Sequence, residues 1–274
     1  MSHWMAGGRW QGRLRELAAR AGQAASVAAL AVVLGLQVSG QEPLRQAWKP
    51  QECGESSVTE PERKEEERET ADWQEPVREE LEIVWQLPEM PNGCEIASLA
   101  MVLNWAGTEA DKMELWENYV PALEVRETQN GLLGGDPEEY YIGDATSRNM
   151  GWYCFEEPLR ETAEAFLDDR GVRFRVEASA GLGRSALESY LDQEIPVIVW
   201  VTQEYEAPEL SERSWTMEDG SIYIPWSNLH CVVVYGRTGE SYQVADPLRG
   251  FQSVESGRFW ESFQSIGAHA LVIW

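Results

Sequence analysis

Apolar residues recur at helical spacing from residue 94 onward, directly after a turn-rich segment. The apolar positions Ile96, Leu99, Val102 and Leu103 lie three or four residues apart or side by side, and Gly107 is a natural stop. Four turn-forming residues precede them, namely Pro88, Pro91, Asn92 and Gly93. The pattern predicts a helix that buries one face and carries Cys94 in its first turn.

Similar patterns predict the other elements. Helices are expected over 111–119, 157–171, 187–193 and 259–263. Strands are expected over 82–86, 172–176, 195–201, 230–236, 241–245 and 268–274, and residues 125–155 are expected to be a loop. Because the helices come first and antiparallel strands cluster late, the order favours an α+β fold over a doubly wound sheet.

The stretch 203–226 is polar and has a turn at Asp219–Gly220. It contains Trp215 and Trp226, and its composition fits two structural interpretations equally well. The stretch is either a lid that borders a substrate groove or a surface hairpin that packs its own tryptophans.

The N-terminal part has a different composition from the rest. Residues 1–23 are basic and residues 24–38 are an uncharged apolar run, so residues 1–40 are expected to be an export signal or an uncleaved signal anchor. Residues 41–80 are acidic and interrupted by proline, which predicts a disordered linker. The folded domain is then expected over 81–274.

Charge and cysteine content limit the possible partners. The formal net charge is −25, from 22 Lys and Arg against 47 Asp and Glu, which argues against a nucleic-acid partner because phosphate binding needs clustered basic residues. The chain has 4 Cys and 3 His and no C-x-x-C pair, so a zinc site is poorly supported. Neither a cofactor nor a metal is expected, and membrane contact is expected only through the N-terminal segment.

Cys94 has the position of a nucleophile. Free N–H groups and the positive end of the helix dipole favour a thiolate in the first turn of a helix. A nucleophilic thiolate needs a base. His230 opens an apolar strand, where its side chain and that of Cys231 point to opposite faces. The alternative is that His230 only forms a hydrogen bond with a backbone group and has no catalytic role.

Two further residues complete a candidate site. Asp246 follows on the next strand, where a carboxylate could orient the imidazole of His230. If Gly236 paired with Ser241, Asp246 would miss His230 by one position, and a bulge at Gly239 would close that gap. Gln86 precedes Cys94 across a loop that could fold back, and its amide could stabilise an oxyanion.

Several segments, taken in order, resemble C39-like cysteine peptidases. Residues 86–95 and the Ala- and Leu-rich helix after them resemble the nucleophile motif of that family. Other resembling segments are 136–137 and 141–144 for the middle loop, 195–201 for the central strand, and 228–236 and 244–250 for the His and Asp motifs. The chain is more narrowly similar to the stand-alone, exported group that is common in Gram-positive bacteria. Asn92 and Cys231 stand where Thr and Ala are frequent, and neither change removes a catalytic group.

The resemblance implies a papain-like α+β fold in which the nucleophile helix packs on an antiparallel sheet. It implies four roles, with Cys94 as nucleophile, His230 as base, Asp246 as its orienting carboxylate and Gln86 as oxyanion donor. It thus implies a cysteine peptidase or related thiol hydrolase, acting on a peptide or protein substrate. The expected location is outside the cell or on the outer face of the cytoplasmic membrane.

Two other hypotheses about function stay open. The same fold could bind a peptide or cell-wall fragment without cleaving it. Alternatively, Cys94 could be held in a disulfide, which export permits. Cys154 and Cys231 would be buried thiols or a pair, and Cys53 could pair with another chain.

Overall fold

The computed structural model describes residues 80–274. The predicted export segment 1–40 and all but the last residue of the predicted linker 41–80 lie outside the described residues. Within residues 80–274 no helix has the length and apolar character that crossing a membrane requires.

A six-stranded sheet forms the centre of the described chain, in the order β11-β10-β9-β6-β12-β5. All five pairings in this sheet are antiparallel. Its strands are β5 (Val176–Ser179), β6 (Val197–Thr202), β9 (Leu229–Thr238), β10 (Ser241–Asp246), β11 (Gly250–Glu255) and β12 (Ala270–Ile273). Every residue of β6 is buried, because this strand has neighbours on both edges and helices on both faces.

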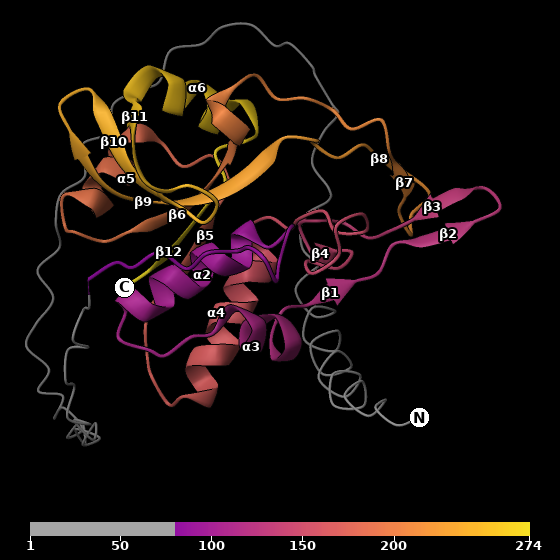
Figure 1. Cartoon of the computed structure of the whole chain (residues 1–274), viewed down its shortest axis with the longest axis horizontal. Helices are drawn as coiled ribbons and strands as arrows, with labels where there is room; N and C mark the ends of the chain where they lie inside the picture. Colours follow the sequence, from indigo (N-terminus) through magenta and orange to yellow (C-terminus); the bar gives the residue numbers. More distant parts are fainter. Residues whose placement is uncertain (1–79) are drawn as a thin grey trace, which may run out of the picture. The chain divides into compact units, whose positions relative to one another are not determined.

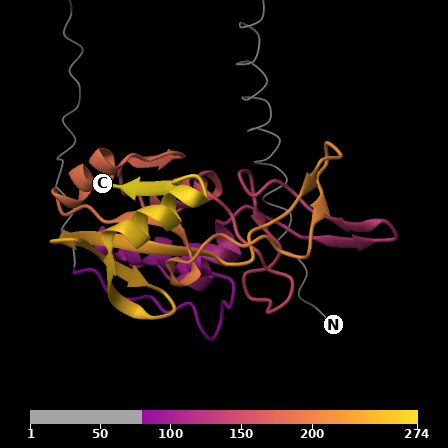
Figure 2. The ribbon, with the colours of Figure 1, turned by 90° about the horizontal axis from the view of Figure 1, so that it is seen from above.

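Helices cover both faces of this sheet. They are α2 (Cys94–Trp105), α3 (Lys112–Asn118), α4 (Glu156–Asp169), α5 (Arg184–Leu191) and α6 (Ser256–Ser265). Figure 1 shows α6 on one side of the sheet and α2, α3 and α4 on the other, and Figure 2 shows the same layers from above. The α+β class expected from the sequence is confirmed, with the helix that starts at Cys94 packed against the antiparallel sheet.

Helix α2 is buried around almost its whole circumference. The sequence predicted one buried face, but of its 12 residues only Asn104 is not buried. The helix packs against β9 and β6 on one side and against α3 and α4 elsewhere. A helix enclosed in this way needs apolar residues all round, which the segment 96–103 supplies.

The start of α2 depends on a close backbone contact. Gly93 is the N-cap residue, and a Cβ atom placed on it would lie 2.6 Å from Cβ of Met90. Any other residue would push these chains apart, so glycine at this position fixes how the turn enters the helix. This turn determines where the side chain of Cys94 lies.

A second sheet, in the order β2-β3-β7-β8, extends from the main body (Figure 1). Its strands are β2 (Arg126–Thr128), β3 (Gly131–Leu133), β7 (Trp215–Thr216) and β8 (Ile222–Tyr223). The strands β1 (Ala122–Leu123) and β4 (Tyr141–Ile142) form a separate parallel pair. The expectation of a loop over 125–155 was therefore wrong, because β2 and β3 form a short hairpin, β3 also pairs with the distant β7, and β4 pairs with β1.

The stretch 203–226 belongs to this second sheet. It starts with the short helix η1 (Gln203–Tyr205) and has the predicted turn, where the N–H of Ser221 bonds to Asp219. Trp215 is buried, stacks on Tyr223, and donates from Nε1 to the carbonyl of Gly135 at 2.8 Å. Packing of the tryptophan under its own hairpin matches the surface-hairpin interpretation at this residue.

Other predicted elements differ in position. Residues 82–86 are not a strand, and the strand expected at 172–176 is β5, which begins at Val176. Strand β11 was not expected at all. The helix expected over 187–193 is α5, which ends at Leu191. The strands containing His230 and Asp246 were placed correctly, since both have strong β-forming patterns.

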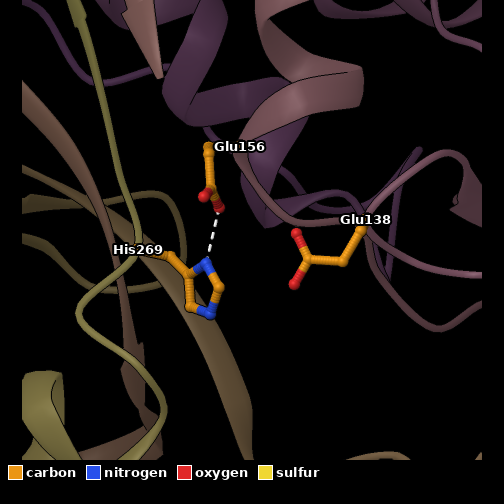
Figure 3. A group of neighbouring side chains, drawn as sticks. All are labelled: Glu138, Glu156 and His269. Atoms are coloured by element: carbon orange, nitrogen blue, oxygen red, sulfur yellow. Dashed lines mark hydrogen bonds and ion pairs between the residues drawn. The ribbon is translucent and has the colours of Figure 1, made fainter. Parts of the chain in front are cut away.

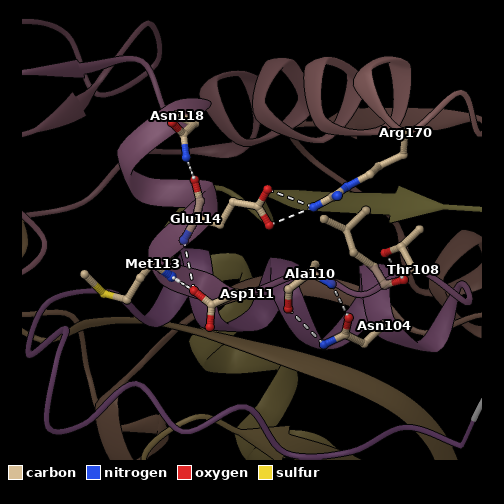
Figure 4. Close-up of polar contacts among 9 residues, drawn as sticks. Asn104, Thr108, Ala110, Asp111, Met113, Glu114, Asn118 and Arg170 are labelled. Atoms are coloured by element: carbon tan, nitrogen blue, oxygen red, sulfur yellow. Dashed lines mark hydrogen bonds and ion pairs between the residues drawn. The ribbon is translucent and has the colours of Figure 1, made fainter. Parts of the chain in front are cut away.

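The connection between α2 and α3 is held by local polar contacts (Figure 4). Asp111 caps α3 by accepting from the N–H groups of Met113 and Glu114 at 2.9 and 3.0 Å. Asn104 exchanges two hydrogen bonds with the backbone of Ala110, at 3.1 and 2.6 Å. Both contacts fix the first turn of α3, which carries Lys112.

Candidate active site

The structure gathers the sequence-predicted residues around the start of α2 and one end of the main sheet. All four are largely buried, with exposed fractions of 9% for Cys94, 2% for Gln86, 3% for His230 and 1% for Asp246. The N–H of Gln86 donates to the carbonyl of Pro247 at 3.1 Å, so the loop before α2 is joined to the strand that carries Asp246.

His230 and Asp246 form a buried pair. Nε2 of His230 lies 2.9 Å from Oδ1 of Asp246. The other ring nitrogen, Nδ1, makes no hydrogen bond with any residue of the described chain 80–274. A histidine held through one nitrogen with the other left open is the arrangement that a general base requires.

The turn between these strands differs from the sequence-based prediction. Strand β9 runs on to Thr238, which pairs with Ser241, and the positive φ of Gly239 suits the two-residue turn that results. The expectation of a bulge at Gly239 was therefore wrong.

A bulge does occur farther along the hairpin. Gly236 pairs with Gln243, but the next pair is Val234 with Val244, so Tyr235 is an extra residue on β9. A bulge of this kind leaves one residue unpaired and shifts the register by one position.

This shift brings Asp246 to the face of His230. Beyond the bulge Ala245 pairs with Val233, so the next residue, Asp246, lies opposite Val232. Val232 and His230 are two residues apart and share a face of the strand. Without the bulge Asp246 would lie opposite Val233, whose side chain points to the other face.

Several contacts hold Asp246 in its charged form. Burial by itself would raise the pKa of this carboxyl, but the hydrogen bond and charge of His230 act in the opposite direction. The N–H of Leu248 donates to Oδ1 at 2.7 Å and Arg249 lies nearby at 3.9 Å. Together these contacts hold the pKa of Asp246 below its ordinary value.

The amide of Gln86 is turned into its own loop. Nε2 donates to the carbonyls of Met90 and Pro91, at 3.3 and 3.0 Å, while the buried Oε1 has no hydrogen-bond partner among the residues that the structure describes. These two bonds brace the turn before Cys94. Donation to an oxyanion would require Gln86 to release one of them, so its predicted role stays a prediction.

Lys112 is a structural part of the site that the sequence-based reasoning missed. Its Nζ donates to the backbone carbonyl of Trp85, to that of Gln86 at 3.2 Å, and to the carboxylate of Glu89 at 2.9 Å. One ammonium thus holds the loop that carries Gln86. The sequence signal was slight, since Lys112 is an isolated base among many acids.

Exposed apolar side chains flank the same loop. Trp85 and Leu87, on either side of Gln86, are 52% and 49% exposed. Phe251 is also exposed and follows Gly250, where an added Cβ would lie 3.3 Å from the ring of Trp85. Three exposed apolar side chains therefore lie around the loop before α2.

The thiol of Cys94 donates a hydrogen bond to the carboxyl group of its neighbour Glu95. Sγ lies 3.3 Å from Oε2 of Glu95, and the structure gives no hydrogen bond between Cys94 and His230. Burial raises the pKa of Cys94 well above its ordinary value, and Glu95 and Cys231 add to the rise. The thiolate that the helix start was expected to favour is therefore opposed by burial in this conformation.

The cysteines in the described range are free thiols, namely Cys94, Cys154 and Cys231. The structure forms no disulfide among these three, including the pair that the sequence allowed for Cys154 and Cys231. Cys231 lies against α2, where its carbonyl accepts a hydrogen bond from Ser98 at 3.3 Å. Because His230 precedes it, this packing holds the histidine beside the helix that begins at Cys94. Cys53 lies outside the described residues.

A second buried histidine also pairs with a carboxylate (Figure 3). Nδ1 of His269 lies 2.6 Å from Oε2 of Glu156, and the ring stacks on Phe155 with centroids 4.1 Å apart. The pair connects the start of α4 to the residue before β12. The sequence-based reasoning did not single out either residue, because nothing local indicates that they meet.

With Glu138, this pair is the one group of possible metal ligands found within the described residues. The three ligand atoms lie within 4.8 Å of one another. Two ligands of one tetrahedral zinc ion lie roughly 3.3 Å apart, from zinc–ligand distances of about 2.0–2.1 Å. The contact of 2.6 Å is that of a hydrogen bond, so metal binding would need a proton to leave and Glu138 to move closer.

Comparison with known proteins places this chain in a family. The chain matches the Peptidase_C39 like family over residues 78–270 and belongs to it. It is 31% identical over 188 residues to the uncharacterised protein YvpB of Bacillus subtilis (strain 168), covering 68% of this chain and 70% of that protein. The fold also matches the crystal structure of a candidate C39-like peptidase from Bacillus anthracis. That match has a TM-score of 0.61 and 26% identity, covering 71% of this chain and 94% of the other.

Proposed function

We propose that this protein is a cysteine hydrolase that cleaves peptide or amide bonds. The observation that carries the proposal is the buried contact of 2.9 Å between His230 and Asp246, which leaves Nδ1 of the imidazole without a hydrogen-bond partner among residues 80–274. That imidazole stands on the strand packed against the helix that begins with Cys94. Membership of a family of C39 peptidases supports the same chemistry.

The proposed reaction assigns one step to each group. The thiol of Cys94 turns from Glu95 toward Nδ1 of His230, which accepts its proton, and the sulfur attacks the substrate carbonyl. The N–H of Cys94, which has no intrahelical acceptor, stabilises the oxyanion together with an N–H released from Gln86. His230 then protonates the leaving amine and activates the water that cleaves the thioester.

Labelling of the full-length protein tests this mechanism. Iodoacetamide should modify Cys94 at pH 6, well below the free-thiol pKa of about 8.5, with peptide mapping to identify the site. His230→Ala should slow that labelling by at least tenfold. Cys94→Ala should abolish cleavage of a mixed peptide library while leaving the circular dichroism spectrum unchanged. Cleavage by the Cys94→Ala protein would exclude the mechanism.

A non-catalytic binding module is the second candidate, and two contacts favour it. The thiol of Cys94 donates its hydrogen bond to Glu95 and not to His230. The side-chain amide of Gln86 donates both of its hydrogen bonds to carbonyls of its own loop. This candidate function predicts that the protein binds a peptide, as measured by calorimetry, and does not cleave it. It also predicts that Cys94 labels like an ordinary thiol, with no effect of His230→Ala.

We further propose that the domain acts outside the cytoplasmic membrane. The support is the basic and apolar composition of residues 1–40. Expression of the full chain in a Gram-positive host should place the domain where an externally added protease reaches it. Protection from that protease in intact cells would exclude the proposal, and the mass of the recovered protein would distinguish a cleaved signal from an anchor.

A further inference from the structure

We propose that Glu95 is the titrating partner of Cys94: in its protonated form it permits the thiolate, and in its charged form it suppresses the thiolate and so sets the upper pH limit of reactivity. The proposal rests on the proposed role of Cys94 as nucleophile. It assigns Glu95 as a positioning residue that acts through the sulfur and does not touch the substrate.

Among residues 80–274 the carboxyl group of Glu95 has one side-chain hydrogen-bond partner, and the backbone N–H groups of Glu95 and Cys154 also act on it, lowering its pKa in part against burial. The side chain of Glu95 is 1% exposed, although it lies in the first turn of a helix. Its Oε2 lies 3.3 Å from the sulfur of Cys94, and its Oε1 is buried with no hydrogen-bond partner in the described part of the chain. A charged carboxylate buried in this way would leave one oxygen without compensation, which is costly.

The groups that face Glu95 do not change charge near neutral pH. Apart from Cys94 itself, they are Tyr141 on β4, Tyr153 and Cys154 before α4, and Cys231 on β9. Burial raises the pKa of each of these groups above its ordinary value. Burial also raises the pKa of Glu95, to about 8, so that Glu95 ionises between pH 7 and 9, where these four groups stay neutral.

The charge of Glu95 reverses its effect on the sulfur. When protonated, its hydroxyl can donate a hydrogen bond to the thiolate and stabilise it. When ionised, it places a second negative charge 3.3 Å from the sulfur in a buried site. The negative charge near Cys94 is therefore shared between two groups that oppose each other's ionisation.

Alkylation of Cys94 as a function of pH tests this inference. The full-length protein and its Glu95→Gln variant would react with iodoacetamide from pH 5.5 to 10, and peptide mass spectrometry would follow Cys94. Because glutamine mimics the neutral acid, the two rates should agree within about twofold below pH 7. At pH 9 the variant should react about three- to tenfold faster, because the neutral amide does not oppose the thiolate as the charged carboxylate does.

Glu89→Gln is the matched control. Glu89 lies on the loop before Cys94, is exposed, and has a pKa below its ordinary value, so its charge is constant over this pH range. Its removal should leave the ratio of variant to wild-type rates independent of pH. A merely structural effect of Glu95→Gln would also give a constant ratio.

Three results would overturn the inference. They are identical pH profiles for the wild type and Glu95→Gln, a constant ratio at all pH values, and a wild type that reacts faster at pH 9. Failure of the catalytic proposal gives a different result, namely wild-type labelling that does not depend on His230.

A second measurement covers the possibility that Glu95→Gln does not fold. An infrared titration of the wild-type protein should show a protonated-carboxyl band that disappears near pH 8 and is altered in Cys94→Ala. Absence of any such band above pH 6.5 would overturn the inference.

Discussion

Nε2 of His230 lies 2.9 Å from Oδ1 of Asp246, and one extra residue in β9 makes this contact possible. Tyr235 has no partner on β10, so the register beyond it moves by one position. That movement brings Asp246 to the strand face that carries His230, because side chains alternate between the two faces. The candidate active site therefore depends on a defect in a β-ladder as well as on the identity of its residues.

Asp246→Asn should weaken both the site and the fold. The amide cannot replace the charge-assisted bond to His230, so the free energy of unfolding at pH 7 should fall by about 1–3 kcal/mol. Labelling of Cys94 at pH 6 should slow at least tenfold. Urea denaturation and iodoacetamide labelling measure these effects, and Asp219→Asn, in an exposed turn, is the control.

The destabilisation by Asp246→Asn should also depend on pH. The pKa of Asp246 is lowered in the folded protein despite its burial, so its contribution is present above its unfolded pKa, about 4, and is lost as the pH falls through the lowered folded value. The difference in stability between variant and wild type should thus narrow below about pH 4. An equal difference at pH 7 and pH 3 would contradict this account.

The three described cysteines should differ in reactivity. Cys154 and Cys231 are fully buried and burial raises the pKa of both thiols, whereas Cys94 retains 9% exposure. Under native conditions iodoacetamide should therefore modify Cys94 and leave the other two intact, and all three should react in 8 M urea. Peptide mass spectrometry distinguishes them, and native modification of Cys231 would mean that β9 separates from α2.

Lys112→Met should loosen the loop that precedes Cys94. The change leaves the carbonyls of Trp85 and Gln86 without this donor while it keeps the apolar length of the side chain. We expect a loss of about 1–3 kcal/mol in the free energy of unfolding and faster hydrogen exchange over residues 85–93. Glu89→Gln removes only the exposed salt bridge between Lys112 and Glu89. It should therefore have a smaller effect on both the free energy of unfolding and the hydrogen exchange.

Glu95 should make the fold less stable as the pH rises. Its folded pKa of about 8 lies above the model-peptide value of 4.5, so the native state holds a proton that the unfolded chain has released between these two values. Stability from this group is complete below the unfolded pKa and is lost as the pH rises through the folded pKa. Between pH 5 and 8 the wild type should lose on the order of 2–4 kcal/mol relative to Glu95→Gln.

Chemical denaturation at pH 5, 6.5 and 8 measures this difference. The variant and wild type should be closest in stability at pH 5 and farthest apart at pH 8. Parallel curves for the two proteins would show that Glu95 is charged in the folded state.

Local patterns were sufficient for the elements that carry the site. The apolar spacing after Gly93 located the helix that begins at Cys94, and the apolar run after His230 located its strand. These predictions succeed because a helix start and a β-alternation depend on neighbouring residues in the chain. The same patterns gave the α+β class and the four candidate residues Gln86, Cys94, His230 and Asp246.

Patterns failed where pairing partners lie far apart in the sequence. Strand β3 forms a short hairpin with β2 and also pairs with β7 across more than 80 residues, and only the second pairing lacks a local signal. Nothing near Glu156 indicated that it would bond to His269, 113 residues away. Short strands of this kind form because a distant segment offers hydrogen bonds, which no window of sequence contains.

The sequence by itself determined which chemical groups the protein has and which of them begin a helix or a strand. Only the tertiary structure decided how these groups act on one another. It placed the bulge at Tyr235 and so joined Asp246 to His230, brought Lys112 to the loop of Gln86, and buried Glu95 against the thiol of Cys94. The physical reason is that register, burial and pKa depend on the surroundings of a residue in space, whereas propensity depends on its neighbours along the chain.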